Sequence, residues 1–436
     1  MYFVQTITPP RAQDFSRRRK LPLARLIVVL LSLVASGRDK GVATKLGEFF
    51  TWARRSGLWP EGHSPHRSAL TKARAKLPWQ ALATLLGHCV ALAYEVFPPR
   101  DEYLWHGLSV FAFDGSTYQL PATEALRHTF DPQSGLTAPG RGHYPQCLVT
   151  TAYDVFRRLP VGRTICALQE GDERAQAQRL LPLLPPHSVS LFDRGFPSYG
   201  FLLYLTQHAH RYVMRCPATS TFPAVQAFVR SGRVETRLWL TPSDTFKRSL
   251  TPAQRRRLAP LRLRAIRLEA PDGTVSVLLT NLVDTRRFPR TAIIALYWRR
   301  WTVETHYRDE KTLQQIEQFH SRTPDGIRQE LFAILIGCVI ARTLTALSVP
   351  SESLETAQSL VQPQLKNALI TFARDAALLT PAHPAQALVI LQELLEAIRQ
   401  VKYYKPKYPR PPRPRVNKQP ANKWQDDRQR KLTKVA

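Results

Sequence analysis

Four side chains that could act on a phosphate recur at helical spacing between residues 297 and 311. With Glu304 as the reference and about 100° per residue, Arg300 lies roughly 40° away, and Tyr297 and Lys311 each lie roughly 20° away. A carboxylate flanked by two cations and a phenol on one stripe suits a metal ion next to a phosphate. An exposed helix with ordinary ion pairs between Arg300, Glu304 and Arg308 would show the same spacing, and such pairs contribute little stability. The segment alone leaves both interpretations open.

Two further acids follow short apolar runs of the kind that form buried strands. Asp114 follows Val-Phe-Ala-Phe and precedes Gly115, and Asp193 follows Val-Ser-Leu-Phe, with Gly195 two residues later. We therefore expect both acids at the ends of strands, where glycine lets other backbone approach closely. An aspartate before glycine is also a common turn residue. Three converging carboxylates, Asp114, Asp193 and Glu304, would match the oxygen ligands that a pair of Mg²⁺ ions needs.

The helical segment fits the signature Tyr, two residues, Arg, three residues, Glu, six residues, Lys at every gap. The chain thus resembles the DDE transposases of bacterial insertion sequences, in the Y-R-E-K group called the insertion sequence four family. Asp114-Gly-Ser and Asp193-Arg-Gly-Phe resemble the family's first and second acidic motifs, in the right order. Further similarity lies in residues 279–282 and 321–331, so the resemblance spans residues 60–345. One departure is the acidic pair Asp309-Glu310 before Lys311.

The resemblance implies a DNA transposase that moves an insertion sequence by cut and paste, through metal-dependent phosphodiester hydrolysis and strand transfer. It implies two Mg²⁺ or Mn²⁺ ions per site, held by Asp114, Asp193 and Glu304, which stabilise the attacking and leaving oxygens. The partners would be double-stranded DNA, as terminal inverted repeats and target, and a second copy of the chain in a homodimer. A hairpin intermediate is an option that the sequence does not decide. The expected DNA contacts are Tyr297, Arg300, Lys311, Arg194 and Arg322.

Two alternatives to a working transposase stay open. The chain could be a catalytically silent descendant that only binds DNA, or an Mg²⁺-dependent nuclease without strand transfer. A lost acid would point to the silent descendant, and all three acids are present. The formation of joined DNA products would distinguish a transposase from a nuclease.

The composition indicates a polyanionic partner independently of any motif. The chain has 436 residues, with 62 Lys and Arg against 33 Asp and Glu, for a formal net charge of +29. Such an excess of cations favours nucleic acid, because each neutralised phosphate releases a counterion. A merely basic surface is the alternative. The five cysteines are scattered without C-x-x-C spacing, which favours a reducing compartment and no zinc site.

A basic cluster at residues 17–20 and an apolar run at residues 26–35 have the order of a signal peptide. The run is too short to span a bilayer as a helix. The basic remainder of the chain and its odd number of thiols favour a buried helix of an N-terminal domain instead. We therefore expect a cytoplasmic bacterial protein that associates with the nucleoid and enters no membrane.

The order of patterns predicts an α/β fold: an RNase H-like catalytic core interrupted by a β-rich insertion, with an N-terminal helical DNA-binding domain and C-terminal helices. The core reads as three strands, helix, strand, helix, strand and a later helix with Glu304. Asp172 is expected to cap the helix at residues 173–184. The predicted layout is an N-terminal DNA-end-binding domain at 1–105, the core at 106–229 and 285–350, the insertion at 230–284, a C-terminal helical region at 351–401 and a basic Pro-rich tail at 402–436.

Three features outside the core could also meet DNA. In the helix at residues 68–77, Lys72 and Lys76 are one turn apart, with Arg74 toward the far side. That helix either recognises DNA ends or packs with a solvated basic face. Trp239 could stack on a displaced base, although ordinary sheet packing is its expected role. The Pro-rich tail, with cations such as Lys405, should be extended and lie along phosphates.

Overall fold

The computed structural model describes residues 14–15, 21–35, 41–134, 143–219, 222–256, 258–269, 273–349, 361–379 and 384–404. The basic tail lies outside these ranges from residue 405 onward. Its extended conformation and its contact with DNA therefore stay predictions.

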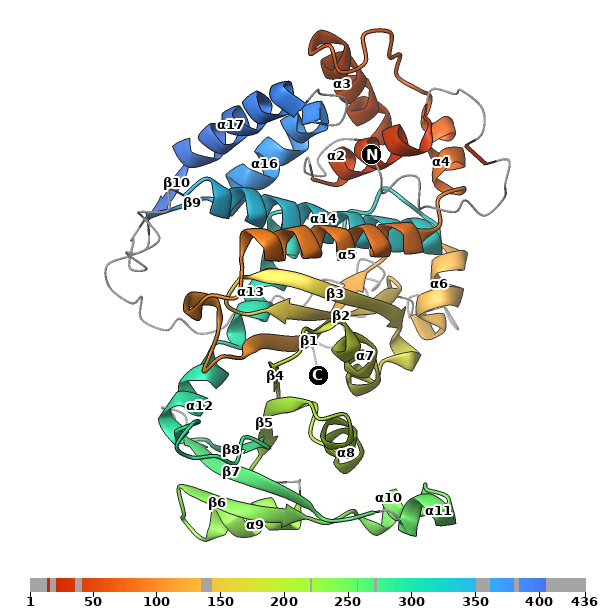
Figure 1. The fold of residues 1–436 in the computed structure, drawn as a ribbon. Coiled ribbons are helices and arrows are strands. Elements are labelled where there is room, and N and C mark those ends of the chain that lie inside the picture. Colours follow the sequence, from red (N-terminus) through yellow and green to blue (C-terminus); the bar gives the residue numbers. More distant parts are fainter. Residues whose placement is uncertain are drawn as a thin grey trace, which may run out of the picture.

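An eight-stranded mixed sheet forms the centre of the molecule, in the order β3-β2-β1-β4-β5-β8-β7-β6 (Figure 1). β1, β2 and β3 are antiparallel neighbours, β1, β4 and β5 are parallel, and β8, β7 and β6 continue antiparallel from β5. The strands are β1 (Ser109–Gln119), β2 (Gln146–Asp154), β3 (Leu159–Ala167), β4 (Ser188–Phe192), β5 (Arg211–Pro217), β6 (Glu235–Leu240), β7 (Leu261–Glu269) and β8 (Val275–Thr280), beside a separate pair β9 (Val361–Pro363) and β10 (Lys402–Tyr404). The mixed α/β fold is confirmed.

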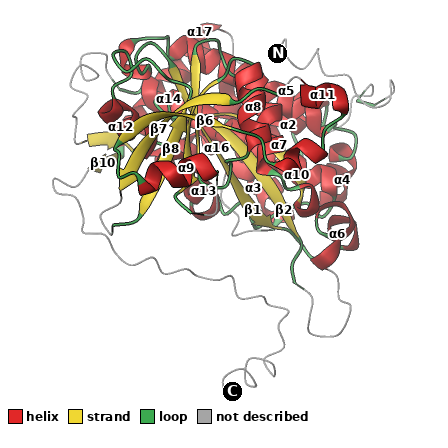
Figure 2. Ribbon diagram, turned by 90° about the horizontal axis from the view of Figure 1, so that it is seen from below, coloured by secondary structure: helices red, strands yellow, loops and turns green. Residues whose placement is uncertain are grey.

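Helices cover both faces of this sheet, as Figure 2 shows from below. The α-helices are α2 (Leu23–Ala35), α3 (Val42–Arg55), α4 (Arg67–Arg74), α5 (Trp79–Val96), α6 (Glu124–Phe130), α7 (Glu173–Leu180), α8 (Tyr199–Gln207), α9 (Pro223–Arg230), α10 (Asp244–Arg248), α11 (Pro252–Arg256), α12 (Arg290–Trp298), α13 (Trp301–Thr312), α14 (Pro324–Leu347), α16 (Leu365–Asp375) and α17 (Pro384–Gln400). Short 3-10 turns are η1 (Asp101–Tyr103), η2 (Pro132–Ser134), η3 (Leu168–Glu170), η4 (Leu181–Leu183) and η5 (Ala376–Leu379).

Two successive residues of β3 identify which helices lie on which face. Side chains alternate between faces along a strand, so Gly162 and Arg163 point to opposite sides. A Cβ on Gly162 would lie 3.2 Å from Leu180 of α7. The guanidinium of Arg163 instead reaches Glu310 of α13, at 2.7 Å. The helix α7 and the helix α13 therefore cover opposite faces of the sheet.

The N-terminal and C-terminal helices pack together on α14 (Figure 1). The hydroxyl of Ser32 in α2 donates to the carbonyl of Ala373 in α16, at 3.0 Å. Leu26 and Leu30 of α2 are fully buried, at 0% and 1% exposed. The buried helix predicted from residues 26–35 is thus confirmed.

The helix α14 is long and apolar enough to cross a membrane by length and composition alone. However, 67% of its most apolar window is buried inside the protein. The helices α5, α2 and α16 all pack against it. This burial is that of a core helix, which is apolar on all sides because protein surrounds it.

The predicted basic face at residues 68–77 does not form as expected. The helix α4 ends at Arg74, so Lys76 lies beyond the helix that carries Lys72. The ammonium of Lys76 pairs with Asp14 at 2.5 Å. Arg74 is buried, and its guanidinium donates to Glu330 of α14 at 2.9 Å. Arg74 therefore joins α4 to α14, and DNA recognition by Lys72 and Lys76 stays a prediction.

The segment at residues 230–284 is rich in strands, as predicted, and β8 pairs with β5, so that these strands extend the core sheet. β6 lies at the outer edge of the sheet. Trp239 on β6 is 59% exposed, and the guanidinium of Arg262 lies 5.9 Å from its ring. Trp239 is therefore not packed in the core, because side chains alternate between the two faces of a strand and Trp239 lies on the exposed face, between the buried Leu238 and Leu240.

Candidate active site

Asp114 lies within β1 and not at its end. The pairing of β1 with β2 continues through Gln119, whereas its pairing with β4 stops at Ala112. The prediction that Asp114 ends its strand is therefore wrong for the pairing with β2, which continues past it. It is right for the pairing with β4, which stops before it. Asp114 lies where one edge of β1 has lost its neighbouring strand, which leaves space beside the acid.

Asp193 follows β4 directly, as predicted for a strand end. Its Oδ1 accepts a hydrogen bond from the backbone N–H of Gly195 at 2.7 Å, so the acid also has the turn role expected of Asp near Gly. Because β4 is the parallel neighbour of β1, Asp193 emerges beside the open edge next to Asp114.

Arg300 joins the third acid to the first. Its Nη2 donates to Oε1 of Glu304 at 2.6 Å, and its Nη1 lies 3.9 Å from Oδ1 of Asp114. Arg300 is only 8% exposed, so this is not the solvated helix-surface pair of the ordinary interpretation. The buried guanidinium brings Glu304 and Asp114 to one site.

The helix predicted to carry all four signature residues is interrupted. α12 ends at Trp298 and α13 begins at Trp301. The N–H of Arg300 bonds the carbonyl of Tyr297, and the N–H of Val303 bonds that of Arg300, which is the tighter three-residue pattern. Arg300 keeps helical backbone angles, with φ −51° and ψ −33°, so the helix pitch changes here but the direction of the chain does not reverse.

Tyr297 lies on α12 close to the acids. It is 4% exposed, and burial raises the pKa of Tyr297 to about 12, against the opposing charges of Arg300 and Arg215. The charge of Asp193 adds to the increase. Tyr297 therefore faces Arg300 and Asp193 as a neutral phenol at ordinary pH.

Lys311 contacts the strand that carries Asp114. Its ammonium donates to the carbonyl of Thr117 at 2.7 Å and lies 4.7 Å from the ring of Tyr118. It also lies 3.9 Å from Glu317. Lys311 thus lies over the later part of β1, where Thr117 is three residues beyond Asp114.

Arg194 and Arg322, the two other expected DNA contacts, are both exposed. Arg194 follows Asp193 directly. The carbonyl of Arg322 accepts from the hydroxyl of Thr123, which lies past the C-terminal end of β1. Arg194 thus adjoins one of the acids in the chain, whereas Arg322 lies beside Thr123.

The electrostatics of Asp114 indicate an excess of negative charge. Burial is the largest cause that raises the pKa of Asp114 to about 7, and the neighbouring charge of Arg300 opposes it. The charges of Glu304, Asp193 and Glu173 raise it further. A site that makes a carboxyl hard to ionise in this way favours a bound cation.

Glu173 is a carboxylate that the sequence interpretation passed over. Asp172 is the N-cap of α7, as predicted, and its side chain accepts from the N–H of Arg174 at 3.1 Å. Glu173 is the next residue, and a Cβ on Gly115 would overlap its carboxylate. The pattern of a cap followed by an acid suggested only a helix start.

The unexpected acid Glu310 has a buried structural partner. Its two oxygens accept from Nη2 of Arg163 at 2.7 and 2.8 Å, and the hydroxyl of Tyr118 donates to Oε2 at 2.5 Å. Burial alone would raise the pKa of Glu310, but Arg163 and His306 hold it well below the usual range. His306, Glu310 and Cys338 offer ligand atoms within 4.8 Å of one another. Because Arg163 already holds the carboxylate, a cation there would face a positive charge.

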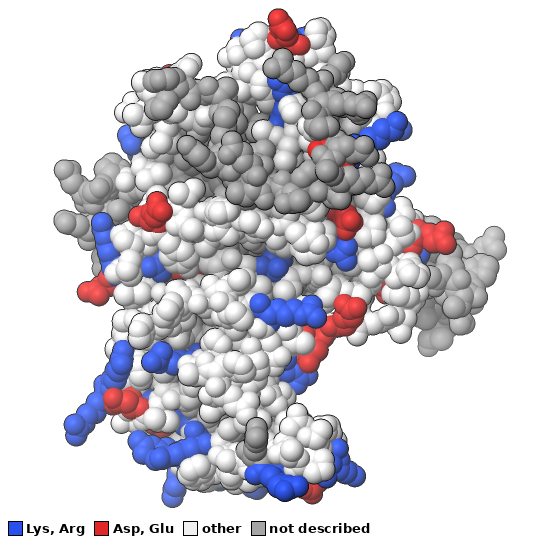
Figure 3. Space-filling view, turned by 45° about the vertical axis from the view of Figure 1, so that its right-hand side comes forward, with Lys and Arg blue, Asp and Glu red and all other residues white. Residues whose placement is uncertain are grey.

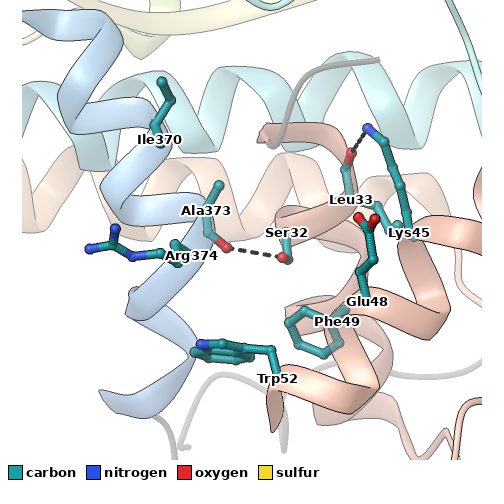
Figure 4. A pocket seen from close by; sticks show the side chains of 9 residues that line it. All are labelled: Ser32, Leu33, Lys45, Glu48, Phe49, Trp52, Ile370, Ala373 and Arg374. Carbon is teal, nitrogen blue, oxygen red and sulfur yellow. Dashed lines mark hydrogen bonds between the residues drawn. The ribbon is translucent and has the colours of Figure 1, made fainter. Parts of the chain in front are cut away.

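A cavity of about 360 Å³ lies among the terminal helices. Figure 4 shows Phe49 and Trp52 of α3 on one side and Ile370 of α16 on the other. None of its lining residues is an acid of the site. The acids instead lie beside the part of β1 that has no β4 partner.

Comparison with known proteins identifies the chain. The family model described as "Transposase DDE domain" matches residues 105–340. The transposase InsG for insertion sequence element IS4 of Escherichia coli K12 is 24% identical over 75% of this chain and 70% of its own length. Two other transposases are y4zB of Sinorhizobium fredii, 28% identical over 36% of this chain and 43% of its own, and InsZ of E. coli K12, 27% identical over 32% and 46%.

Among solved structures, a piggyBac transposase synaptic complex with hairpin DNA aligns over 90% of this chain and 80% of its own. The TM-score is 0.41 and the identity 12%, which is too low to decide the fold. The family match covers more than half of the chain and contains Asp114, Asp193 and Glu304. The chain belongs to the family of transposases with a DDE domain, whose members use divalent metal ions, and it is a DNA transposase.

Proposed function

We propose that Asp114, Asp193 and Glu304 hold two Mg²⁺ or Mn²⁺ ions and that this transposase moves its element by cut and paste. The observation that carries the proposal is the buried Arg300 bridge between Glu304 and Asp114, at 2.6 and 3.9 Å. The guanidinium can hold both acids in place for a metal ion. Its Nη1 has no hydrogen-bond partner, so it can also bind a phosphate oxygen.

The residues present fit hard divalent cations. All three acids offer carboxylate oxygens, which Mg²⁺ prefers. Nη1 of Arg300 is buried and has no hydrogen-bond partner, so one strong donor faces the site without an acceptor. A buried donor without an acceptor is costly, and a phosphate oxygen of bound DNA would satisfy it.

The side chains of the site would divide the work. Bound metal ions would activate water and stabilise the attacking and leaving oxygens. Arg300 would orient Glu304 through one nitrogen and bind a phosphate oxygen through the other. Lys311, anchored on the carbonyl of Thr117, would add positive charge beside β1, and the phenol of Tyr297 would orient the same phosphate.

The sheet supports an RNase H-like core. The order β3-β2-β1-β4-β5, antiparallel at first and then parallel, brings an acid on β1 next to an acid after β4. The helix α13 carries the third acid against β1. We therefore retain the proposed layout, with residues 106–229 and 285–350 as the core and 230–284 as its insertion.

The segment from α9 to β7 has the charge of a DNA-binding surface. Figure 3 shows Lys and Arg side chains gathered at the end of the molecule where these elements lie. We propose that DNA lies along this surface and past Arg194, and that two copies of the chain act on paired element ends. The exposed cations of the segment are Arg230, Arg233, Arg237, Lys247, Arg248, Arg255, Arg256 and Arg262.

A strand-transfer assay tests the proposal against its alternatives. A labelled duplex of the element's end is incubated with a supercoiled target plasmid and Mg²⁺. A transposase yields cleaved ends and labelled plasmid. Cleaved ends without labelled plasmid would support the nuclease alternative, and DNA binding without cleavage would support the silent descendant.

Arg300→Ala is expected to lower strand transfer about a hundredfold, because misplacing a reacting group by about 1 Å has an effect of that size. Arg308→Ala is the matched control, since Arg308 is exposed on the same helix. The strand-transfer rate of Lys311→Ala is expected to lie between those of the Arg300 and Arg308 variants. Lys405→Ala, in the tail, should mainly lower the slope of log affinity against log salt. Strand transfer that is equal in the Arg300 and Arg308 variants would return Arg300 to an ordinary ion-pair role.

A further inference from the structure

We propose that Glu173 is a fourth carboxylate of the active site and that it shares a metal ion with Asp193. The inference rests on the proposed function, because it adds a ligand to the metal site formed by the three signature acids. It also assigns a role to the helix α7, which none of those acids occupies.

Two glycines make room for the Glu173 carboxylate. A Cβ on Gly115 would overlap Oε1 of Glu173 and lie 2.8 Å from its Cδ. A Cβ on Gly195 would lie 3.1 Å from Oδ1 of Asp193 and 3.8 Å from Oε2 of Glu173. The carboxylates of Glu173 and Asp193 therefore flank one point, and a side chain at Gly115 would displace the carboxylate of Glu173.

The topology explains how acids from opposite faces of the sheet meet. Glu173 comes from α7 and Glu304 from α13, which cover opposite faces. Beyond Ala112, β1 has no β4 partner, so its edge is open to both faces beside Asp193. Glu173 reaches this edge over Gly115, and Glu304 reaches it through Arg300.

The environment of Glu173 differs from that of an ordinary first-turn acid. An acid in the first turn of a helix is stabilised by the helix dipole and usually remains solvated. Glu173 is instead partly buried, and its carboxylate lies beside Gly115 and near that of Asp193. Next to the first acid, the buried Nη1 of Arg300 lies 3.9 Å from Asp114 and has no hydrogen-bond partner. Several carboxylates beside a donor that has no acceptor suit a metal ion that binds a phosphate.

Binding of Mn²⁺ alone to the full-length protein tests this role without any DNA reaction. Free Mn²⁺ is measured by electron paramagnetic resonance in a titration of the wild type, Glu173→Gln, Asp193→Asn and Glu170→Gln. Glu170 is the matched control, because it is an exposed acid three residues earlier. Loss of a ligand in Glu173→Gln should weaken the affinity for one Mn²⁺ by about ten- to a hundredfold. Glu170→Gln should bind Mn²⁺ as the wild type does.

The outcomes separate this inference from the proposed function. If Glu173→Gln binds Mn²⁺ as tightly as the wild type while Asp193→Asn is weakened, Glu173 is not a ligand and the proposed function stands. If Asp193→Asn is also unchanged, or if the wild type binds no Mn²⁺ at millimolar concentration, the metal site itself is wrong.

A second pair of variants tests the geometry. Gly115→Ala keeps every acid, yet its methyl group would occupy the place of the Glu173 carboxylate, so it should weaken Mn²⁺ binding as Glu173→Gln does. In the Glu173→Ala background that methyl group has room, so Gly115→Ala should then have no further effect. Additive losses in the double variant would overturn the proposed contact. Melting temperatures of all variants show whether each one is folded.

Discussion

Asp114→Asn is expected to abolish DNA cleavage and to leave binding to the element's end intact. The acid would hold metal and not read DNA, and removing an anion cannot weaken the attraction to phosphate. Loss of a core catalytic group lowers rates by about a thousandfold or more. Asp193→Asn and Glu304→Gln should behave alike. Cleavage is measured with Mg²⁺, and binding is measured by gel shift without metal.

The stability of the Asp114 variant provides the control. Because burial and three neighbouring acids raise the pKa of Asp114 to about 7, the ionised carboxylate is unfavourable in the metal-free protein. Asp114→Asn removes that charge, so its melting temperature without metal should equal or exceed that of the wild type. A lower melting temperature would mean that Asp114 supports the fold. Loss of DNA binding in Glu304→Gln as complete as its loss of cleavage would make Glu304 a structural residue.

Local patterns predicted the elements that carry the acids. The run Val110 to Phe113 is fully buried, as its apolar character indicated, and β4 ends directly before Asp193. Such strands can be predicted because burial on both faces leaves a continuous apolar run in the sequence. Helical periodicity likewise placed Glu304 and Lys311 on one helix, α13.

Features that depend on distant partners could not be predicted in this way. The pitch change at Arg300 places Tyr297 on a separate helix, which a constant 100° per residue cannot represent. The position of Glu173 depends on α7 packing over Gly115, and nothing near residue 173 encodes that approach. Glu310 stood out only as part of an acidic pair that departs from the family pattern, because its partner Arg163 lies 147 residues away in the sequence.

The buried pair of Arg163 and Glu310 is expected to dominate the stability of the catalytic helix. Both side chains are 0% exposed, and the pair joins α13 to β3. Removing one partner leaves an uncompensated buried charge, which costs about 3–5 kcal/mol. Arg163→Met and Glu310→Met should each lower the midpoint of thermal unfolding strongly, and the double variant should lose much less than the sum of the two.

The pair should also make the protein sensitive to acid. The pKa of Glu310 is lowered in the folded protein, so its contribution to stability is fully present above the ordinary glutamate pKa of about 4.3 and is lost as pH falls below that value. The double variant lacks this carboxylate and should lose less stability than the wild type as pH falls below ~4. Hydrogen exchange of α13 shows whether the loss of stability is local to this helix. Opening of α13 should be faster than in the wild type in each single variant and close to wild type in the double variant. If Glu310→Met unfolds at the wild-type midpoint, the ion pair does not anchor α13, and Glu304 must be held in place by Arg300 and the packing of Val303 and Tyr307 alone.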